Sequence, residues 1–490
     1  MAVKGGQIIH VANDQVLLDR LQTAGPGNVN IPRETIYELG NYRSVAQVSG
    51  IPDLSFSLES FDVTTEMEAF LLRKPVATTH SYDLAAAKYT NLKSAFKPGQ
   101  NAAAPYDVAG SASIPCLRLE QMSYAFGVGT TNARQTATLR GDTLYYSSGS
   151  TYIKEVAGTN TPNQTIALDH DSYGLMEAGV LRYTLAITAG EKRLTYGADY
   201  TETVGTVTAG AATVSVVILD AVPTTDVIAI SYHSPAVETF PQSVHALVSG
   251  VGTASTASAA IGATSVTVTS STGFAAGQTI ILGSGSGGEL AVVSAVPDAT
   301  HITLASPTVA LHASGTAVSV YVPTVKPAAV RGKDIDIYIG PAFPAGTAPA
   351  TARGTWRHGA QSANVDWRVT IQNDEEMGNS HYVDSDFDVP QVSGSVTFRP
   401  RDVAAIMALV NDFGNNSSAG TTHYAAGIGD GTALDLQIAI RNPADGRVLK
   451  RLHVPDARFT VPGYSGRVQQ KLDLQAQFQS DQGLLYVYDS

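Results

Sequence analysis

The stretch ELGNYRSVAQVSGIPDLSFSL, residues 38–58, is matched without a gap by EMGNSHYVDSDFDVPQVSGSV, residues 376–396. The shift is a constant 338 residues, and seven of the 21 positions are identical. Ordinary residue frequencies would give roughly one or two identities. Further along, Ile114-Pro115 matches Val454-Pro455 at a shift of 340. A register that drifts so little indicates one ancestral unit used twice.

Each copy shows the pattern of an antiparallel sheet covered by one helix. Apolar residues alternate with polar ones, which are Ser55, Ser57 and Glu59 in the first copy and Ser393, Ser395 and Thr397 in the second. A helix is expected after each strand, capped by Asp62 or Asp402. The helices would bury Val63, Met67, Phe70 and Leu71 in the first copy, and Val403, Ile406, Met407 and Val410 in the second. The fold class we expect is mainly β: two β-sandwich or barrel units, each with one flanking helix, plus inserted small all-β modules.

The middle of the chain has a different character, with many short strand patterns and turns. A Gly/Ser/Thr/Ala-rich stretch at 249–260 reads as a linker inside it. The expected division is 1–160 for the first repeated unit, 161–250 and 251–325 for two small β modules, and 326–490 for the second unit. The GSGSGG run at 283–288 is expected to be a hairpin tip, because no Gly-Lys-Ser/Thr follows it.

Composition excludes several function classes. Charged residues make up 15% of the 490, and the net charge is −12, so no basic stripe for gripping nucleic acid is present. No apolar run reaches the roughly 18 residues of a spanning helix. The N-terminus lacks the apolar stretch of a secretory signal, which predicts synthesis in a cytoplasm.

Motifs for chemistry are also missing. Asp384, Asp386 and Asp388 alternate but lack the Gly and Glu of a calcium loop. His170 is expected to be a solvated turn residue, and Cys116 a small buried thiol rather than a nucleophile. We therefore expect no enzyme, no catalytic residue, no metal and no cofactor. An enzyme acting on carbohydrate remains a rival, with Glu375 and Glu376 as its carboxylates, although neighbours on a strand point to opposite faces.

The repeated unit, apolar-Pro-x-apolar-Ser-x-Ser-apolar followed by a capped helix and closing strands, resembles the tail tube fold of long-tailed bacteriophages. The segment LTYGADY at 194–200, followed by VIAISYHS, resembles Ig-like modules of tail and fibre proteins. The segment from Ile261 to Pro307 resembles another small β module inserted into tail proteins. The long stretch 73–113 has a shorter counterpart in the second copy, so the two copies cannot make identical contacts.

The resemblance implies an assembly. Three chains with two units each would form a trimeric ring with pseudo-sixfold symmetry, and stacked rings would form the tail tube of a virion, through which DNA is ejected. Sheets would extend between neighbouring chains into one inner barrel. Ser55, Ser57, Glu59, Ser393, Ser395 and Thr397 are the candidate lumen-facing residues, and both helices would lie outside the barrel. Loops at 73–113 and 411–433 would reach the next ring.

The expected partners are further copies of this chain, other tail proteins and viral DNA that passes without specific binding. An acidic or neutral lumen would let DNA slide without sticking. The modules would project outward and could contact a host surface, and no membrane insertion is expected. Such bulky decorations favour a non-contractile tail. The alternative is a capsid or fibre decoration protein, or an adhesin, made of tandem β modules.

Overall fold

The computed structural model describes the following residues: 8–12, 16–18, 21–26, 29–36, 46–61, 67–68, 71, 90–96, 110–129, 132–177, 179–190, 192–236, 250–283, 288–321, 330–340, 355–356, 359–375, 381–382, 384–401, 433–443, 446, 448–460, 463–465, 472–480 and 482–489. They form antiparallel sheets, so the expectation of a mainly β fold is confirmed. Among these residues, the one helix with both ends described is a short 3-10 helix, η5 (Gly332–Asp334).

The largest sheet has 17 strands and takes them from both ends of the chain. The first half contributes β1 (Ile8–Ala12), β2 (Val16–Leu18), β3 (Leu21–Pro26), β6 (Leu54–Ser60), β7 (Thr90–Phe96), β8 (Gly110–Gly127), β9 (Arg134–Gly141) and β10 (Tyr145–Ser147). The second half contributes β27 (Ile335–Gly340), β28 (Thr355–Trp356), β29 (Ala360–Arg368), β32 (Gln391–Phe398), β33 (Ala433–Arg441), β34 (Val448–Phe459), β35 (Gly463–Ser465), β36 (Asp473–Ser480) and β37 (Tyr486–Asp489).

The two halves repeat one order of strand pairing. In the first, the path β3·β6·β9·β8·β7·β1 is antiparallel throughout. In the second, the path β29·β32·β36·β34·β33·β27 corresponds to it strand by strand. Each half also carries a separate hairpin at the same place in the order: β4 (Arg33–Ile36) with β5 (Ala46–Ser49), and β30 (Ile371–Asp374) with β31 (Asp384–Phe387). The duplication seen in sequence is therefore a duplication of topology.

A β-bulge repeats in the same place in both halves. Cys116 and Asp456, each just after a proline, have positive φ angles of 58° and 48°. The backbone N–H of Cys116 donates to Asn91 Oδ1 at 3.0 Å, and that of Asp456 donates to Asp435 Oδ1 at 3.2 Å. The positive φ is costly for a residue with a Cβ, and a bulge re-aims the strand that carries it. Both long strands thus change direction at equivalent residues.

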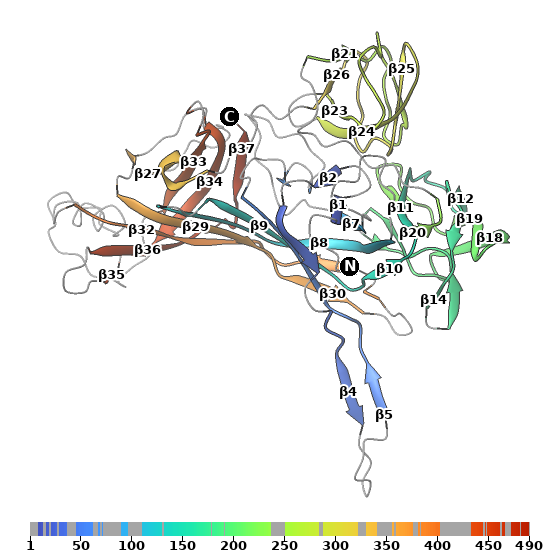
Figure 1. The fold of residues 1–490 in the computed structure, drawn as a ribbon, viewed down its shortest axis with the longest axis horizontal. Coiled ribbons are helices and arrows are strands. Elements are labelled where there is room, and N and C mark those ends of the chain that lie inside the picture. Colours follow the sequence, from blue (N-terminus) through green and yellow to red (C-terminus); the bar gives the residue numbers. More distant parts are fainter. Residues whose placement is uncertain are drawn as a thin grey trace, which may run out of the picture.

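The two halves are joined through β8 and β29, which pair from Gln121 opposite Arg368 to Gly127 opposite Ser362. One ladder, β3·β6·β9·β8·β29·β32·β36·β35, therefore runs through the whole large sheet. Figure 1 shows β9, β8, β29, β32 and β36 lying side by side along it. One apolar cluster, from Leu54 to Val487, fills the inner side of both halves.

Two modules with cores of their own are inserted between the halves. The first has two four-stranded sheets around one core from Ile166 to Tyr232, a sandwich arrangement. Its strands are β11 (Ser150–Ala157), β12 (Gln164–Ala167), β13 (Ser172–Tyr173), β16 (Ala186–Ala189), β17 (Lys192–Arg193), β18 (Tyr200–Thr208), β19 (Ala211–Ile218) and β20 (Val227–Ser234), with the hairpin β14 (Leu175–Glu177) and β15 (Val180–Arg182) beside them.

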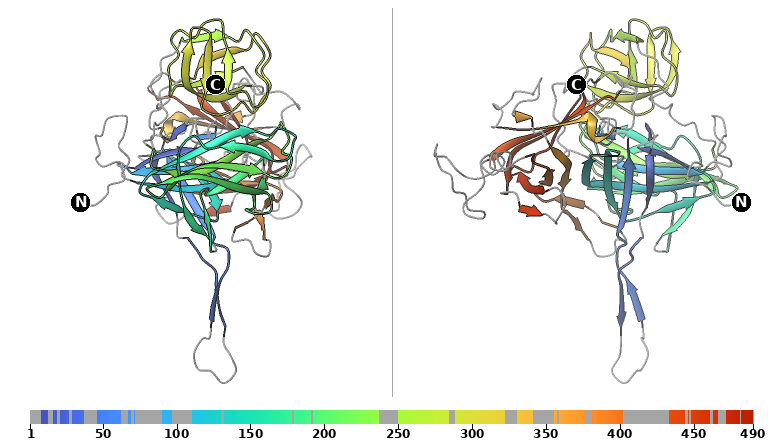
Figure 2. Two further views of the ribbon diagram at one scale, coloured as in Figure 1. Left: turned by 90° about the vertical axis from the view of Figure 1, so that its right-hand side faces the viewer. Right: turned by 60° about the vertical axis from the view of Figure 1, so that its left-hand side comes forward.

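The second module is a six-stranded sheet around a core from Ala259 to Val320. Its strands are β21 (Gly252–Ala254), β22 (Ser265–Thr267), β23 (Thr279–Leu282), β24 (Glu289–Asp298), β25 (His301–Leu304) and β26 (Ala317–Val320). β23 and β24 pair antiparallel, and residues 284–287 of the expected hairpin tip between them lie outside the described residues. Figure 2 shows this module standing off the large sheet, and the β4–β5 hairpin extending away from the body.

Three details differ from the sequence expectations. Residues 150–157 were expected in the first repeated unit, but they form β11 and pair with β20, a strand of the first module. The expected linker at 249–260 contributes β21 and the buried Ala259 to the second module. The stretch 73–113, expected as a loop, contains β7 and the start of β8; the first six residues of β7 are all buried, so no alternation marks it as a strand.

The expected helices are described only in part. Met67, Glu68 and Leu71 have helical backbone and are buried. The other named positions, Val63, Phe70, Val403, Ile406, Met407 and Val410, lie outside the described residues, as does the expected loop at 411–433 except for Ala433.

Candidate lumen surface and buried junctions

The six candidate lumen residues lie on one face of one continuous ladder. Residues opposite each other in an antiparallel pair share a face. Starting from Glu59, successive partners across the ladder lead to Ser393 and beyond. The row is Glu59, Thr136, Ser123, Asp366, Ser393, Gln479 and Arg458. The polar strands of the two copies therefore form a single surface, which we call the polar face.

The polar face is open to solvent, and the other side of the ladder is closed. Ser55 and Ser393 are exposed, and Ser57, Glu59, Ser395 and Thr397 are half-buried. The alternate residues, Leu54, Phe56, Leu58, Val392, Val396 and Phe398, are at most 1% exposed. The expected alternation is thus present in both strands. That these residues line a bore stays a prediction.

Part of the polar face is hollowed. A depression of about 760 Å³ lies over β29, β32, β34 and β36. Its lining is mostly amide and hydroxyl: Asn364, Ser393, Ser395, Thr460, Gln475, Gln477 and Gln479, with Asp366 and Arg458 as its charges. Asn364 accepts hydrogen bonds from the backbone N–H and hydroxyl of Ser395 at 2.8 and 2.6 Å and donates to Asp366 at 3.1 Å. These contacts hold the polar groups close to the sheet.

Charges on the described part of the polar face are balanced. They comprise the arginines 118, 134, 140, 368, 399 and 458 and the carboxylates of Asp53, Glu59, Glu120, Asp366 and Asp473, with Asp384 3.9 Å from Arg118. Arg140 donates twice to Asp53, at 2.8 and 2.7 Å, and Arg399 donates twice to Asp473, at 2.7 and 3.0 Å. The hydrogen bond to Asp53 raises the pKa of Arg140, and the bond from Arg399 lowers the pKa of Asp473. Arginines held in such pairs already have counter-ions.

A buried charged cluster ties the two halves together behind the ladder. Lys450 on β34 donates to Glu68 and, at 3.0 Å, to Gln135. The Tyr124 hydroxyl donates to the same carboxylate, and the Lys450 ammonium lies 4.6 Å from the Tyr124 ring centroid. All four side chains are inaccessible to solvent. Burial first, and then the neighbouring Glu68, raise the pKa of Tyr124, so it acts as a donor. Removing one charge would leave the other buried without compensation.

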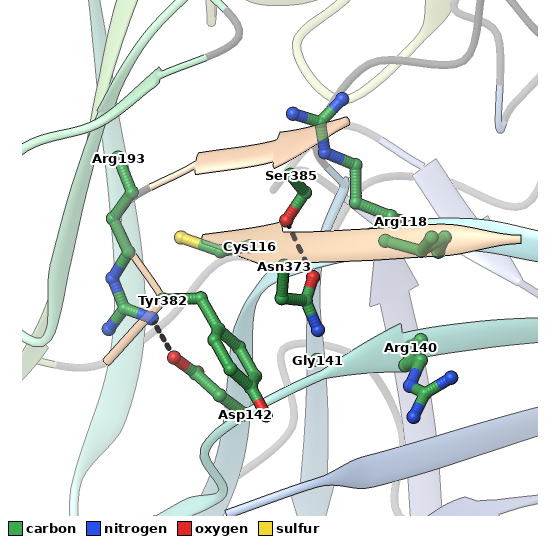
Figure 3. Close-up of a pocket in the computed structure, with 10 residues that line it drawn as sticks. Cys116, Arg118, Arg140, Gly141, Asp142, Arg193, Asn373, Tyr382 and Ser385 are labelled. Atoms are coloured by element: carbon green, nitrogen blue, oxygen red, sulfur yellow. Dashed lines mark hydrogen bonds and ion pairs between the residues drawn. The ribbon is translucent and has the colours of Figure 1, made fainter. Parts of the chain in front are cut away.

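A second buried cluster joins both halves to the first module. Arg193 of β17 pairs with Asp142, which follows β9 (Figure 3). His381, which precedes β31, contacts Asp142 Oδ2 through Nδ1 at 3.1 Å and Glu177 of β14 through Nε2. Burial acts to lower the pKa of His381, but hydrogen bonds to the two carboxylates outweigh it and leave that pKa raised. Against the cost of burial, Arg193 and His381 hold the pKa of Asp142 well below its usual range.

Of the residues with possible chemistry in the sequence, Cys116, Asp384, Glu375 and His170 are among those described. Cys116, in the small cavity of Figure 3, is buried, and burial raises its thiol pKa to about 11, so the reactive thiolate is scarce near neutrality. Asp384 lies 3.9 Å from Arg118, and no group of three metal-ligating side chains occurs among the described residues. Glu375 is exposed, and Glu376 lies outside the described residues. His170 is exposed in a bend, with its ring against Tyr152.

No protein-family model matches the sequence, and a search of curated proteins found no match. In the described part of the chain, no helix is long and apolar enough to cross a membrane.

Sequence reasoning identified three strands of the polar face and missed the others: β6, β32 and β36, the last from the alternation of Leu472, Leu474, Ala476 and Phe478 with polar residues. The alternation of β9 (Gln-Thr-Ala-Thr-Leu-Arg, from Gln135) and of β29 around Asn364 would have marked them as strands. Neither pattern identifies the pairing partner. No pattern in the sequence predicts the buried clusters, because lysine and glutamate side chains are usually exposed to solvent.

Proposed function

We propose that this protein is a structural component of a virion that assembles as trimeric rings, stacked into the tail tube of a long-tailed bacteriophage. The observation that carries the proposal is the ladder that runs unbroken through both halves, with a polar face on one side and the whole apolar core on the other. A sheet of this kind suits the wall of a water-filled bore. The duplicated topology supports two wall segments per chain.

Ring closure is supported by strand arithmetic. The ladder has eight strands, so three chains would supply 24. With strands about 4.8 Å apart and tilted by about 40°, a closed barrel of that number has a backbone diameter on the order of 50 Å. Barrels with fewer strands already hold an aqueous channel. Such a bore has room for duplex DNA.

Passage of DNA is supported by the balance of charge on the polar face. A basic bore would bind phosphates repeatedly along its length. Here Arg134, Arg140 and Arg399 pair with carboxylates of the same face, the first at 3.8 Å from Glu59. Amides and hydroxyls supply most of the remaining surface. DNA would meet hydrogen-bonding groups without a net attraction.

The flanking helices and modules take outer positions in this assembly. Met67 and Leu71 belong to the core behind the ladder, so a helix there lies on the side away from the polar face. The first module follows β10 and the second precedes β27, and both strands pair outside the ladder, β10 with residues 111–113 of β8 and β27 with β33. The modules would decorate the outside of the tube, where they leave the bore clear.

A second candidate function, decoration or adhesion, is favoured by apolar residues at the edge of the first module. Met176 and Leu181, opposite each other in the β14–β15 hairpin, are 65% and 49% exposed. Binding to intact cells that is lost in a Met176→Ser, Leu181→Ser variant would support this role.

The tail tube proposal is tested by electron microscopy and light scattering on the purified protein. We expect hollow threefold rings or tubes, with a ring mass of three times 51.2 kDa. Solid particles of one copy that never polymerise, also in the presence of tail tips, would contradict the proposal and favour the decoration role.

A further inference from the structure

We propose that neighbouring copies join by antiparallel pairing of β3 in one copy with β35 in the next, with Gly25 opposite Ser465. The proposal rests on the ring proposed above and names the strands and register of its subunit junction. It follows from a comparison of the internal junction with the two ends of the ladder.

The internal junction shows what this interface looks like when it is formed. On one edge, residues 123–125 of β8 pair with β9; on the other edge they pair with β29. Asn364 lies opposite Ala125, and Val365 lies opposite Tyr124. This pairing joins the first repeated topology to the second within one chain.

β35 is the equivalent of residues 123–125 in the second half. Ser123, Tyr124 and Ala125 face Thr136, Gln135 and Arg134 on β9. Gly463, Tyr464 and Ser465 face Gln475, Leu474 and Asp473 on β36. The shift is 340 residues on one strand and 339 on its partner for every pair. β8 pairs with β29 on its second edge, whereas no described strand pairs with the equivalent edge of β35.

β3 is the equivalent of β29 in the first half. Thr23, Ala24 and Gly25 face Glu59, Leu58 and Ser57 on β6. Ser362, Ala363 and Asn364 face Thr397, Val396 and Ser395 on β32. Both strands even carry an irregularity of register at the residue before, Gln22 and Gln361. In the described part of the chain β3 pairs with β6 alone. β29 uses its second edge to pair with β8, whereas no described strand pairs with the equivalent edge of β3.

The two open edges are complementary halves of one interface. They lie at opposite ends of an eight-strand ladder, with β35 at the end away from β9 in Figure 1. An open strand edge is a template for another strand. Because β3 and β35 are different surfaces, their contact is head-to-tail, the kind that closes into a ring when the rotation allows it. The occupant of each edge is therefore a second copy of this chain.

The register follows by moving the internal pairs to the equivalent residues. Asn364 opposite Ala125 becomes Gly25 opposite Ser465, and Val365 opposite Tyr124 becomes Pro26 opposite Tyr464. Gly25 shares a face with Ser57, and Ser465 lies opposite Asp473, so this register continues the polar face across the junction. A slip of one residue would turn that face over. Within the bounds of β3 and β35 this register makes two facing pairs, Gly25 with Ser465 and Pro26 with Tyr464. Pro26, the last residue of β3, has no N–H to donate to Tyr464.

The test is disulfide cross-linking across the proposed pair. Directly opposed residues have Cβ atoms close enough for a disulfide, and a Cβ at Gly25 meets nothing within 4 Å. Cys116 is buried and is retained in every variant. Gly25→Cys with Ser465→Cys should form covalent trimers in non-reducing electrophoresis after mild oxidation. Ala125→Cys with Asn364→Cys is the positive control and should cross-link within one chain.

Two further variants test register and polarity. Ala24→Cys with Ser465→Cys, slipped by one residue, should cross-link at least tenfold less. Gly25→Cys alone should give no dimers, whereas a mixture of the two single variants should give dimers only. Dimers of Gly25→Cys alone, or rings that form without cross-linking at the proposed pair, would overturn the junction and leave the ring. A protein that stays monomeric and uncross-linked at about millimolar concentration would overturn both.

Discussion

At the scale of single residues, buried charges connect the two halves of the large sheet. Lys450, Glu68, Gln135 and Tyr124 contact one another between the two halves. Desolvation makes such an ion pair a weak source of net stability, but breaking it is costly. The cluster therefore specifies how the halves meet more than it adds to the free energy of folding.

Lys450→Met should lower the free energy of unfolding by about 3–5 kcal/mol, because the carboxyl group of Glu68 would stay buried without its ammonium partner. Adding Glu68→Gln should restore most of the loss. Thermal unfolding of the large sheet, followed by tryptophan fluorescence of the core residue Trp367, measures both. The matched control is Lys192→Met, which breaks the half-exposed pair with Asp199 and should cost less than about 1 kcal/mol. Equal losses in both single variants would contradict the argument.

His381 should make stability depend on pH in one direction. Its pKa is raised in the folded state, so its contribution is complete below the unfolded value of about 6.5 and is lost as pH rises through the folded value. His381→Gln should therefore destabilise the protein more at pH 6 than at pH 9. Thermal unfolding of both proteins across this range checks the sign. His170→Gln, at an exposed bend, serves as the control. A gap that widens with rising pH would refute the assignment.

At the scale of elements, the close approach of β29, β32 and β36 depends on one glycine. A Cβ at Gly394 would lie 2.1 Å from the Asn364 carbonyl oxygen and 2.6 Å from the Phe478 ring. Backbone at that distance cannot move aside without opening the ladder. Gly394→Ala should cost about 1–3 kcal/mol of unfolding free energy, measured by thermal unfolding. Gly25→Ala, where a Cβ meets nothing, should be almost neutral. Similar effects of the two changes would show that the ladder is not packed as described.

How far sequence predicts these elements depends on where each strand's partner lies. β6 and β32 were identified because Ser55 and Ser393 alternate with core residues. No local sequence pattern predicts the pairing of β8 with β29, because the two strands are more than 200 residues apart in the chain and meet only in the folded molecule. β7 escaped detection since Lys93 is buried and donates to the Thr151 carbonyl at 3.0 Å, which no composition rule anticipates. Cys116, by contrast, is buried as expected.

At the scale of the whole molecule, the balance of charge on the polar face should control the affinity for DNA. Glu59→Lys with Asp366→Lys would add four positive charges per chain to that face. Assembled rings of this variant should retain duplex DNA at 50 mM salt and release it as salt rises, because phosphate contacts release counter-ions. The unaltered protein should retain none. Filter binding across a salt series measures this.

The control for the charge reversal places the same charges on the first module. Asp169→Lys with Asp199→Lys changes net charge equally, at residues away from the polar face. It should leave DNA retention low. Retention by the unaltered protein, or equal retention by both variants, would contradict sliding along the polar face.

The position of the two modules between the halves has a consequence for the order of events during synthesis. The β8 edge that ends at Gly127 waits for β29, which ends at Arg368, 241 residues later. At about 5–20 residues per second, the ribosome needs roughly 12–48 s to deliver the partner. Both modules can fold in that interval, since each has its own core. The interval also exposes the β8 edge to the β29 of another nascent chain, so crowded polysomes favour strand exchange between copies of this protein.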